Sequence, residues 1–185
     1  MNLMEVLMNA QGGGMIRQLA NQFGLDERQA TAAVEHLLPA LTGGLQRNLS
    51  QEGGLESLLG ALGSGHHQQY LDDPELLGRS ETVADGNGIL GHLLGSKEVS
   101  RQVAQRASEQ TGIGASVLKQ MLPLVATMVM GALSKQSAAH GLTGAGARAQ
   151  SADALGVISQ FLDFDRDGSA LDDVLGMMGK IFRGR

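Results

Sequence analysis

The segment VLKQMLPLVATMVMGAL, residues 117–133, is apolar on most sides when it is drawn as a helix. A helix on the surface of a protein has one apolar stripe, whereas a helix that is apolar all round is surrounded by other elements. The strongly apolar part, Met121 to Leu133, has 13 residues, and a bilayer span needs about 20. The segment therefore predicts a central buried helix, with Leu122 in its interior, and no membrane span.

Shorter amphipathic helices are expected on both sides of this central helix. Apolar residues recur with a helical period of 3.6 in several stretches that are bounded by glycines or capping residues. Asp26 followed by Gln29 has the spacing of a capping box at a helix start. The 27 glycines of the 185-residue chain must either separate helices or lie where helices approach closely. These patterns predict an all-α, multihelical fold.

Two helical hairpins of the sequence resemble each other. The motif RQLA at 17–20 precedes Leu38-Pro39 by the same offset at which RQVA at 101–104 precedes Leu122-Pro123. An internal duplication around the central helix would explain this likeness. The alternative is that unrelated helical hairpins have converged on similar glycine and proline positions.

The chain divides into three regions by its periodicity. We expect an N-terminal helical region at 1–62, a flexible connection at 63–88, and a C-terminal helical region with an Asp-rich loop at 89–185. The middle region lacks an evident helical period and holds clustered turn-forming residues. All three regions are expected to belong to one structural unit.

Composition disfavours several classes of function. The net charge of −5 repels phosphate backbones and anionic lipids, and no basic cluster offsets it, so nucleic acid is not expected as a partner. Without cysteine the chain has no disulfide and no thiolate nucleophile. Residues 1–10 lack the basic and long apolar parts of a secretory signal. We therefore expect a cytoplasmic protein.

The strongest local motif is DFDRDGS at 163–169, which matches the first positions of an EF-hand calcium loop. The twelfth position of such a loop would be Val174 instead of the usual bidentate Glu. The alternative is a polar turn with solvated carboxylates. A calcium site in this loop would be weak and would use Asp163, Asp165, Asp167, the Ser169 carbonyl and the Asp173 carboxylate.

Catalytic patterns are missing from the sequence. No serine, histidine and acid occur in a nucleophile-elbow context, and no glycine-rich stretch follows a strand to bind phosphate. His66-His67 is a possible transition-metal pair, although a solvated pair in a loop is the simpler interpretation. A hydrolase of unrecognised type, built from scattered Asp and His, stays an alternative. We expect a non-enzymatic protein.

A DNA-binding regulator is another alternative. Residues 19–38 have the form of a helix-turn-helix with Gly24 in the turn, and the second helix offers Arg28 and Gln29 as contacts. The same helix also carries Glu27 and Glu35, which repel phosphate. The leading hypothesis is instead a helical protein-interaction or self-association module, because the helices are apolar and interrupted by glycine and no catalytic set is present.

Three segments in the second half of the chain carry a family resemblance. They are GILGHLLGSKE at 88–98, KQMLP at 119–123 and the Asp-rich stretch at 162–176. On these segments the chain resembles a bacterial family of unknown function, domain family 937, which is related to the YidB-like proteins.

The resemblance extends to the first half, where GLD at 24–26 together with Leu38-Pro39 is similar to the helical hairpin of YidB-like proteins. It implies a YidB-like array of helical hairpins, and the family offers no established activity to transfer. It also implies that the Asp-rich loop, with its paired Asp172 and Asp173, is a loop type of the family's own.

Overall fold

The computed structural model describes residues 3–64, 66–141 and 151–162, and this part of the chain contains helices and no strand. The all-α, multihelical fold predicted from the sequence is confirmed. The helices, in chain order, are α1 (Leu3–Asn9), η1 (Ala10–Gly13), α2 (Gly14–Phe23), α3 (Glu27–Leu49), α4 (Gly54–Ser64), α5 (Gln69–Asp72), η2 (Pro74–Gly78), α6 (Ser80–Leu94), α7 (Lys97–Thr111), α8 (Ala115–Ala139) and α9 (Ser151–Leu162).

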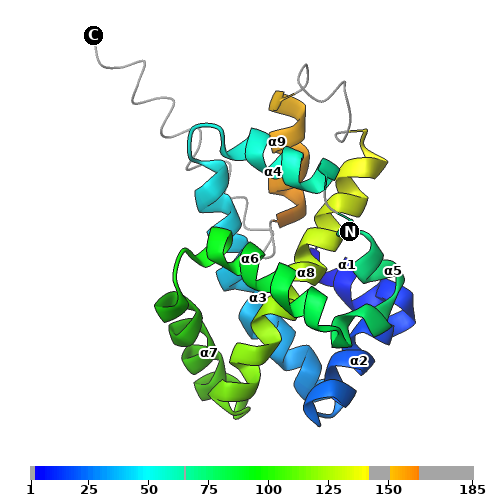
Figure 1. Cartoon of the computed structure of the whole chain (residues 1–185), viewed down its shortest axis with the longest axis vertical. Helices are drawn as coiled ribbons and strands as arrows, with labels where there is room; N and C mark the ends of the chain where they lie inside the picture. Colours follow the sequence, from blue (N-terminus) through cyan, green and yellow to red (C-terminus); the bar gives the residue numbers. More distant parts are fainter. Residues whose placement is uncertain (1–2, 65, 142–150, 163–185) are drawn as a thin grey trace.

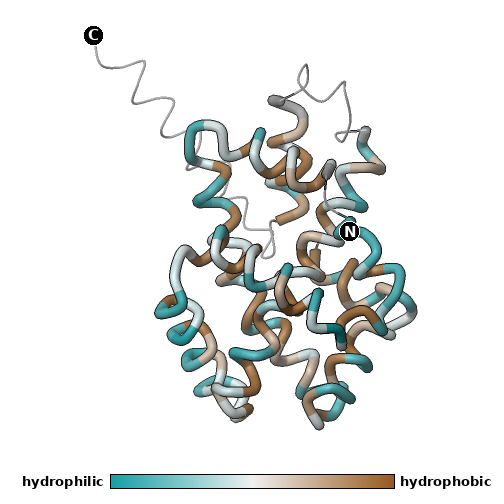
Figure 2. The backbone as a smooth tube through the Cα atoms, viewed as in Figure 1, coloured by the Kyte–Doolittle hydropathy of each residue, from teal (hydrophilic) through white to brown (hydrophobic). Residues whose placement is uncertain are grey.

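Helix α8 is the central element, as its sequence predicts. It crosses the molecule between α3, α6 and α7, and it also contacts α1, α4, α5 and α9 (Figure 1). Every residue from Met121 to Ser134 is buried, and Leu122 is 0% exposed. Hydrophobic residues gather around α8, whereas the outer side of α7 is hydrophilic (Figure 2). The core of the protein is therefore built around α8.

The length and composition of α8 would also allow it to cross a membrane. Its most apolar 18-residue window has a mean hydropathy of 1.5, and 78% of that window is buried inside the molecule. The core helix of a soluble protein meets the same criteria, so the hydropathy alone is weak evidence for a span. The expected lack of a membrane span stays a prediction.

The hairpins α2–α3 and α7–α8 have similar ends. Gly24 and Gly112 close α2 and α7 in the left-handed conformation, with φ of 64° and 73°, which a glycine adopts without a steric penalty. The capping box of α3 is present: the Asp26 carboxylate accepts from the Gln29 backbone N–H at 2.8 Å, and the Gln29 side chain accepts from the Asp26 N–H at 3.1 Å. The duplication itself stays a prediction.

Two glycines let α6 approach its neighbours closely. A Cβ atom at Gly86 would lie 2.1 Å from the Pro123 carbonyl oxygen of α8, and a Cβ atom at Gly44 of α3 would lie 2.2 Å from the Leu93 carbonyl oxygen of α6. Real side chains do not reach such distances, so α6 can sit against both α8 and α3 only because these positions have no side chain.

Most of the segment 63–88, in which the sequence shows no evident helical period, is helical in the structure, and its flexibility stays a prediction. Residues from Gln69 onward form α5, η2 and the first half of α6, and Leu71 and Leu77 are buried. The helical period of α6 was hidden because its buried face uses Thr82 and Gly86, which a hydropathy pattern does not register as apolar. Helix α6 instead packs along α8 as part of the core.

Candidate functional site

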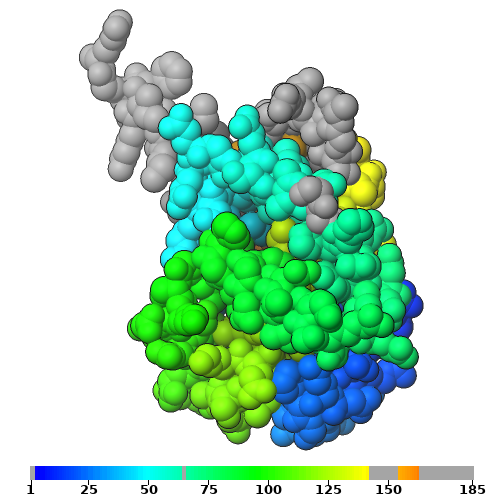
Figure 3. Space-filling view, viewed as in Figure 1, coloured from blue at the N-terminus to red at the C-terminus, as the bar shows by residue number. Residues whose placement is uncertain are grey.

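A cavity of about 770 Å³ lies between α4 and α6. The space-filling view shows the surface hollowed between these two helices (Figure 3). The end of α3, the turn at 51–53, the residues at 66–70 and Met130 of α8 complete its wall. A volume of a few hundred cubic ångströms or more is the usual size of a ligand-binding pocket.

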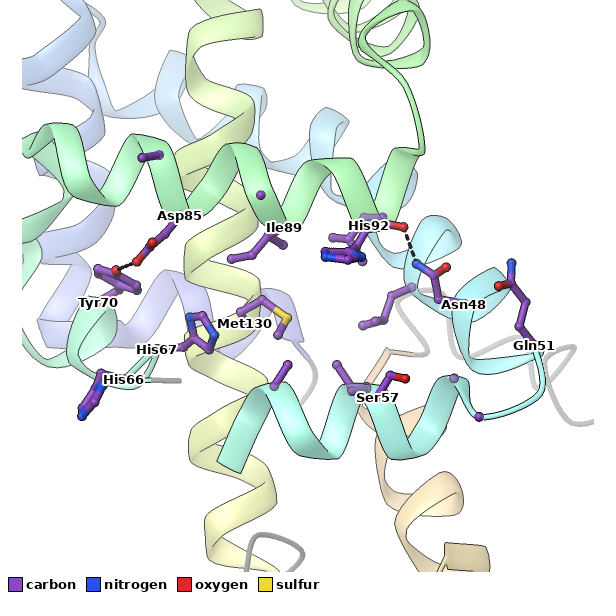
Figure 4. Close-up of a pocket in the computed structure, with 18 of the residues that line it drawn as sticks. Asn48, Gln51, Ser57, His66, His67, Tyr70, Asp85, Ile89, His92 and Met130 are labelled. Carbon is purple, nitrogen blue, oxygen red and sulfur yellow. Dashed lines mark hydrogen bonds between the residues drawn. The ribbon is translucent and has the colours of Figure 1, made fainter. Parts of the chain in front are cut away.

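The cavity has an apolar wall and many polar groups (Figure 4). The apolar side chains come from α3, α4, α6 and α8 and are Leu45, Leu58, Ile89, Leu93 and Met130. The polar side chains come mainly from the loops and from α6 and are Asn48, Gln51, Glu52, Ser57, His66, His67, Gln69, Tyr70, Asp85 and His92. The site therefore offers both hydrophobic contact and hydrogen bonds to an occupant.

Tyr70 and Asp85 form a hydrogen-bonded pair at one end of the cavity. The Tyr70 hydroxyl donates to Oδ2 of Asp85 (Figure 4). Burial raises the pKa of Tyr70 to about 12, and the hydrogen bond to Asp85 and its negative charge act in the same direction. The hydroxyl thus keeps its proton at neutral pH and holds the carboxylate in place.

His67 lies beside this pair. Its ring centre is 6.3 Å from that of Tyr70, and in Figure 4 the ring lies between Tyr70 and Met130. Burial lowers the pKa of His67, although the charge of Asp85 opposes this shift. The Nδ1 atom of His67 is buried and has no hydrogen-bond partner within the described part of the chain. The ring is therefore a neutral group with an unused polar atom.

A second hydrogen bond fixes the opposite end of the cavity. The Asn48 side-chain amide donates to the His92 carbonyl oxygen at 2.6 Å (Figure 4). This bond joins the end of α3 to the end of α6, next to the close contact that Gly44 permits. The cavity is thus framed by helices that other contacts hold in place.

The structure separates the two histidines that the sequence offered as a metal pair. His66 is exposed at the edge of the cavity, whereas His67 is partly buried and lies beside Tyr70 (Figure 4). Over the ranges 3–64, 66–141 and 151–162, no group of three or more His, Asp or Glu residues could hold a metal ion. The calcium ligands predicted at 163–173 lie outside the described residues.

The helix-turn-helix alternative corresponds to α2 and α3. Arg28 and Gln29 are exposed, but Gln29 is engaged in the capping box, and Glu27 and Glu35 are exposed on the same helix. This mixed charge gives no basic face at α3. DNA binding stays an alternative from the sequence.

The cavity contains serine, histidine and carboxylate side chains, which also occur in the active sites of hydrolases. The hydrogen bonds that join such groups in hydrolases are not seen among the described residues. Catalysis by a serine requires a hydroxyl that donates to a base, and a base oriented by a third group. Among the described hydrogen bonds none joins the Ser57 hydroxyl to a histidine, and His67 Nδ1 is unpartnered.

Sequence reasoning missed Tyr70, Asp85 and Asn48. Tyr70 is the single tyrosine of a chain with 3% aromatic residues, and a buried tyrosine usually needs a hydrogen-bond partner. That signal could have drawn attention to a nearby carboxylate. The sequence around Asp85 shows no helical period, so it does not indicate that Asp85 lies on a helix facing Tyr70.

The fold and the cavity define an all-α, multihelical protein with an open cavity. The family described as "Bacterial protein of unknown function (DUF937)" matches residues 5–136. The chain belongs to this family, which confirms the resemblance to domain family 937. The relation to YidB-like proteins stays a prediction. No curated protein and no solved structure shows a significant match to the chain.

Proposed function

We propose that this protein is a non-enzymatic interaction module that binds a segment of a partner protein in the cavity between α4 and α6. The observation that carries the proposal is the open cavity itself, with its apolar wall and polar rim. Protein interfaces commonly combine an apolar centre, where a few side chains are fully buried, with a polar surround.

The shape of the cavity favours an extended occupant. Asp85 and His92 stand at its two ends and are seven residues apart on α6, which corresponds to about 10 Å along a helix axis. Hydrogen-bonding groups lie at both ends, and Ile89 lies between them (Figure 4). A short peptide segment could place one apolar side chain in the middle and polar groups at either end.

Site-specific crosslinking in the native host tests this proposal. A photoreactive residue is introduced at Ala61 or Ala84, which are exposed and line the cavity, or at the exposed Gln105 of α7 as a control. We expect a discrete protein adduct from the two cavity positions. An adduct whose mass equals two chains would show that the partner is a second copy.

A blocking variant makes the test specific to the cavity. Gly88 lines the cavity and Gly91 does not, and a Cβ atom at either position meets open space. We expect Gly88→Phe to remove the adduct and Gly91→Phe to leave it. The proposal fails if Gln105 gives the same adducts, or if the adducts do not respond to Gly88→Phe.

Calcium binding by the Asp-rich loop is a separate proposal, supported by the alternation of Asp163, Asp165 and Asp167 in the sequence. A ligand that binds only the folded state stabilises it by mass action. Millimolar calcium should therefore raise the melting temperature, and Asp163→Asn combined with Asp165→Asn should abolish the rise. An unchanged melting curve with no heat of binding in calorimetry would identify the loop as a polar turn.

A further inference from the structure

The part of the chain that forms the cavity is strongly acidic. Residues 48–96 contain seven carboxylates, at 52, 56, 72, 73, 75, 81 and 85, against one arginine, Arg79, no lysine and three histidines, and Arg47 and Lys97 flank this range. Glu52 and Asp85 line the cavity itself, and no Lys or Arg does so. Lys135 of α8 lies 3.9 Å from Asp72, away from the cavity lining. A charged occupant of this cavity would therefore meet negative charge.

We propose that the cavity selects a basic segment of a partner protein, with a Lys or Arg side chain held at Asp85 and a neighbouring apolar side chain packed against Ile89 and Met130. This inference rests on the proposed function and names the chemistry of the partner.

Asp85 is suited to receive a cation. Its Oδ2 atom accepts from the Tyr70 hydroxyl, and no hydrogen bond or ion pair to its Oδ1 atom occurs within the described residues. Because the high pKa of Tyr70 keeps the hydroxyl protonated, this hydroxyl donates to Oδ2 and fixes the orientation of the carboxyl group. One carboxylate oxygen is thus positioned, and the other is available for an ammonium or guanidinium group.

The surroundings of Asp85 do not supply a competing positive charge. Burial lowers the pKa of His67, so its ring is neutral at pH 7. Its unpartnered Nδ1 atom adds a hydrogen-bonding group next to the proposed cation position. An anionic occupant would instead bring like charges together, which is unfavourable in a partly desolvated site.

The apolar wall supplies the second half of the selectivity. Ile89 is one helical turn beyond Asp85 on α6, on the same face, and Figure 4 shows it opposite Met130. An apolar side chain inserted between them would bury hydrophobic surface, which contributes about 25 cal/mol per Å². A cation without an apolar neighbour would lose this contribution and would be held only by Asp85, which is exposed.

Three synthetic peptides of equal length test the proposal against the full chain: one of Leu and Lys, one of Leu and Glu, and one of Gly and Lys. Binding is measured by fluorescence anisotropy. We expect the Leu/Lys peptide to bind at least tenfold more tightly than the other two. Gly88→Phe should abolish this binding, and Gly91→Phe should leave it unchanged.

Charge variants distinguish a site from general attraction to an acidic protein. Asp85→Asn keeps an acceptor for Tyr70 and removes the charge, so we expect at least tenfold weaker binding of the Leu/Lys peptide. Glu52→Gln should weaken it less. Glu35→Gln removes a charge from the exposed side of α3 at a position that does not line the cavity, and should have no effect. A melting curve for each variant shows that its fold is retained.

Failure of this inference is separable from failure of the proposed function. Equal weakening by Asp85→Asn and Glu35→Gln, tight binding of the Leu/Glu peptide, or no binding of the Leu/Lys peptide would each overturn selection of a basic segment. The binding function would still stand if crosslinked adducts from Ala84 remained sensitive to Gly88→Phe.

Discussion

The hairpins α2–α3 and α7–α8 share their sequence landmarks but lie in different surroundings. In each, a left-handed glycine ends the first helix and a proline interrupts the second. Pro39 of α3 is exposed, whereas Pro123 of α8 is buried. One hairpin presents a polar side to solvent, and the other contributes the core helix of the molecule.

The difference arises from what packs against each long helix. Helix α3 keeps charged or polar residues such as Glu35, His36 and Arg47 on an exposed side. Helix α8 is enclosed by α3, α6 and α7 and has no charged residue between Gln120 and Ser134. The same hairpin pattern can therefore serve at the edge or at the centre, and the composition of the second helix distinguishes the two positions.

The largest expected effect concerns the contact of α6 with each hairpin. Gly86→Ala would place a Cβ atom 2.1 Å from the Pro123 carbonyl oxygen and should lower the free energy of unfolding by about 3 kcal/mol or more. Gly44→Ala meets the Leu93 carbonyl oxygen at 2.2 Å but should cost less, because the peripheral α3 can move outward. Urea denaturation measures both.

Gly91→Ala on α6 is the control for this pair, because a Cβ atom there meets nothing within 4 Å. It should leave stability unchanged or raise it by up to about 1 kcal/mol through helix propensity. Equal effects of Gly86→Ala and Gly91→Ala would contradict the close contact of α6 and α8.

The next largest effect on stability is expected when the leucine that precedes each proline is replaced by alanine. Leu122 and Leu38 are both 0% exposed, and each change to Ala should cost about 2–5 kcal/mol. We expect Leu122→Ala to lie nearer the upper end, since neighbours on all sides of α8 limit the collapse of the resulting cavity. Thermal unfolding of the two variants compares them directly, and a loss under about 1 kcal/mol for Leu122→Ala would argue against a central α8.

Replacing the proline of each hairpin should change the stability of the protein by different amounts. Pro39→Ala restores a backbone donor within α3 and removes a steric conflict, so stability should rise by about 1–3 kcal/mol. Pro123→Ala makes the same backbone gain but loses contacts of the buried ring, and its net gain should be smaller. Calorimetric melting temperatures provide the comparison. A larger gain at Pro123 would mean that its ring contributes little to the core.

The smallest expected effects are at the starts of the long helices. Asp26→Ala removes the capping box of α3 and should cost about 1 kcal/mol. Gly114, the N-cap of α8, makes no side-chain cap hydrogen bond and has a φ of −55°, which any residue adopts. Gly114→Asp should therefore stabilise by roughly a few tenths of a kcal/mol. Chemical denaturation measures the change in the free energy of unfolding for both variants. No loss of stability for Asp26→Ala would show that tertiary packing alone holds the start of α3.

Local patterns in the sequence were sufficient for most of the fold. The capping box at Asp26, the left-handed glycines at 24 and 112 and the apolar segment around Leu122 all mark features that depend on residues close together in the chain. The sequence does not indicate helix α6, because Gly86 on its buried side is required by the close contact with α8, a helix distant in sequence. The hydrophobic period of an amphipathic helix can be recognised in a sequence only when the residues on its buried face are large and apolar.

Even less of the candidate site than of the fold can be predicted from patterns in the sequence. His67 was noticed as part of a possible metal pair, yet its neighbours in the structure are Tyr70 and Asp85, and His66 is exposed at the edge of the cavity. Tyr70 and Asp85 are 15 residues apart and belong to different helices. Nothing in their spacing predicts that they meet, because the path of the chain through η2, between α5 and α6, sets their approach.

The sequence by itself determined that this protein is all-α, where most helices begin and end, which helix forms the core, and to which family the chain belongs. These properties follow from helix propensity, capping and hydrophobic period, which act over a few residues. Only the tertiary structure decided that α6 lies against both α3 and α8 and that a cavity with a positioned carboxylate opens beside it. Close approach and cavity shape depend on how side chains from distant segments pack together. No pattern among neighbouring residues in the sequence specifies this packing.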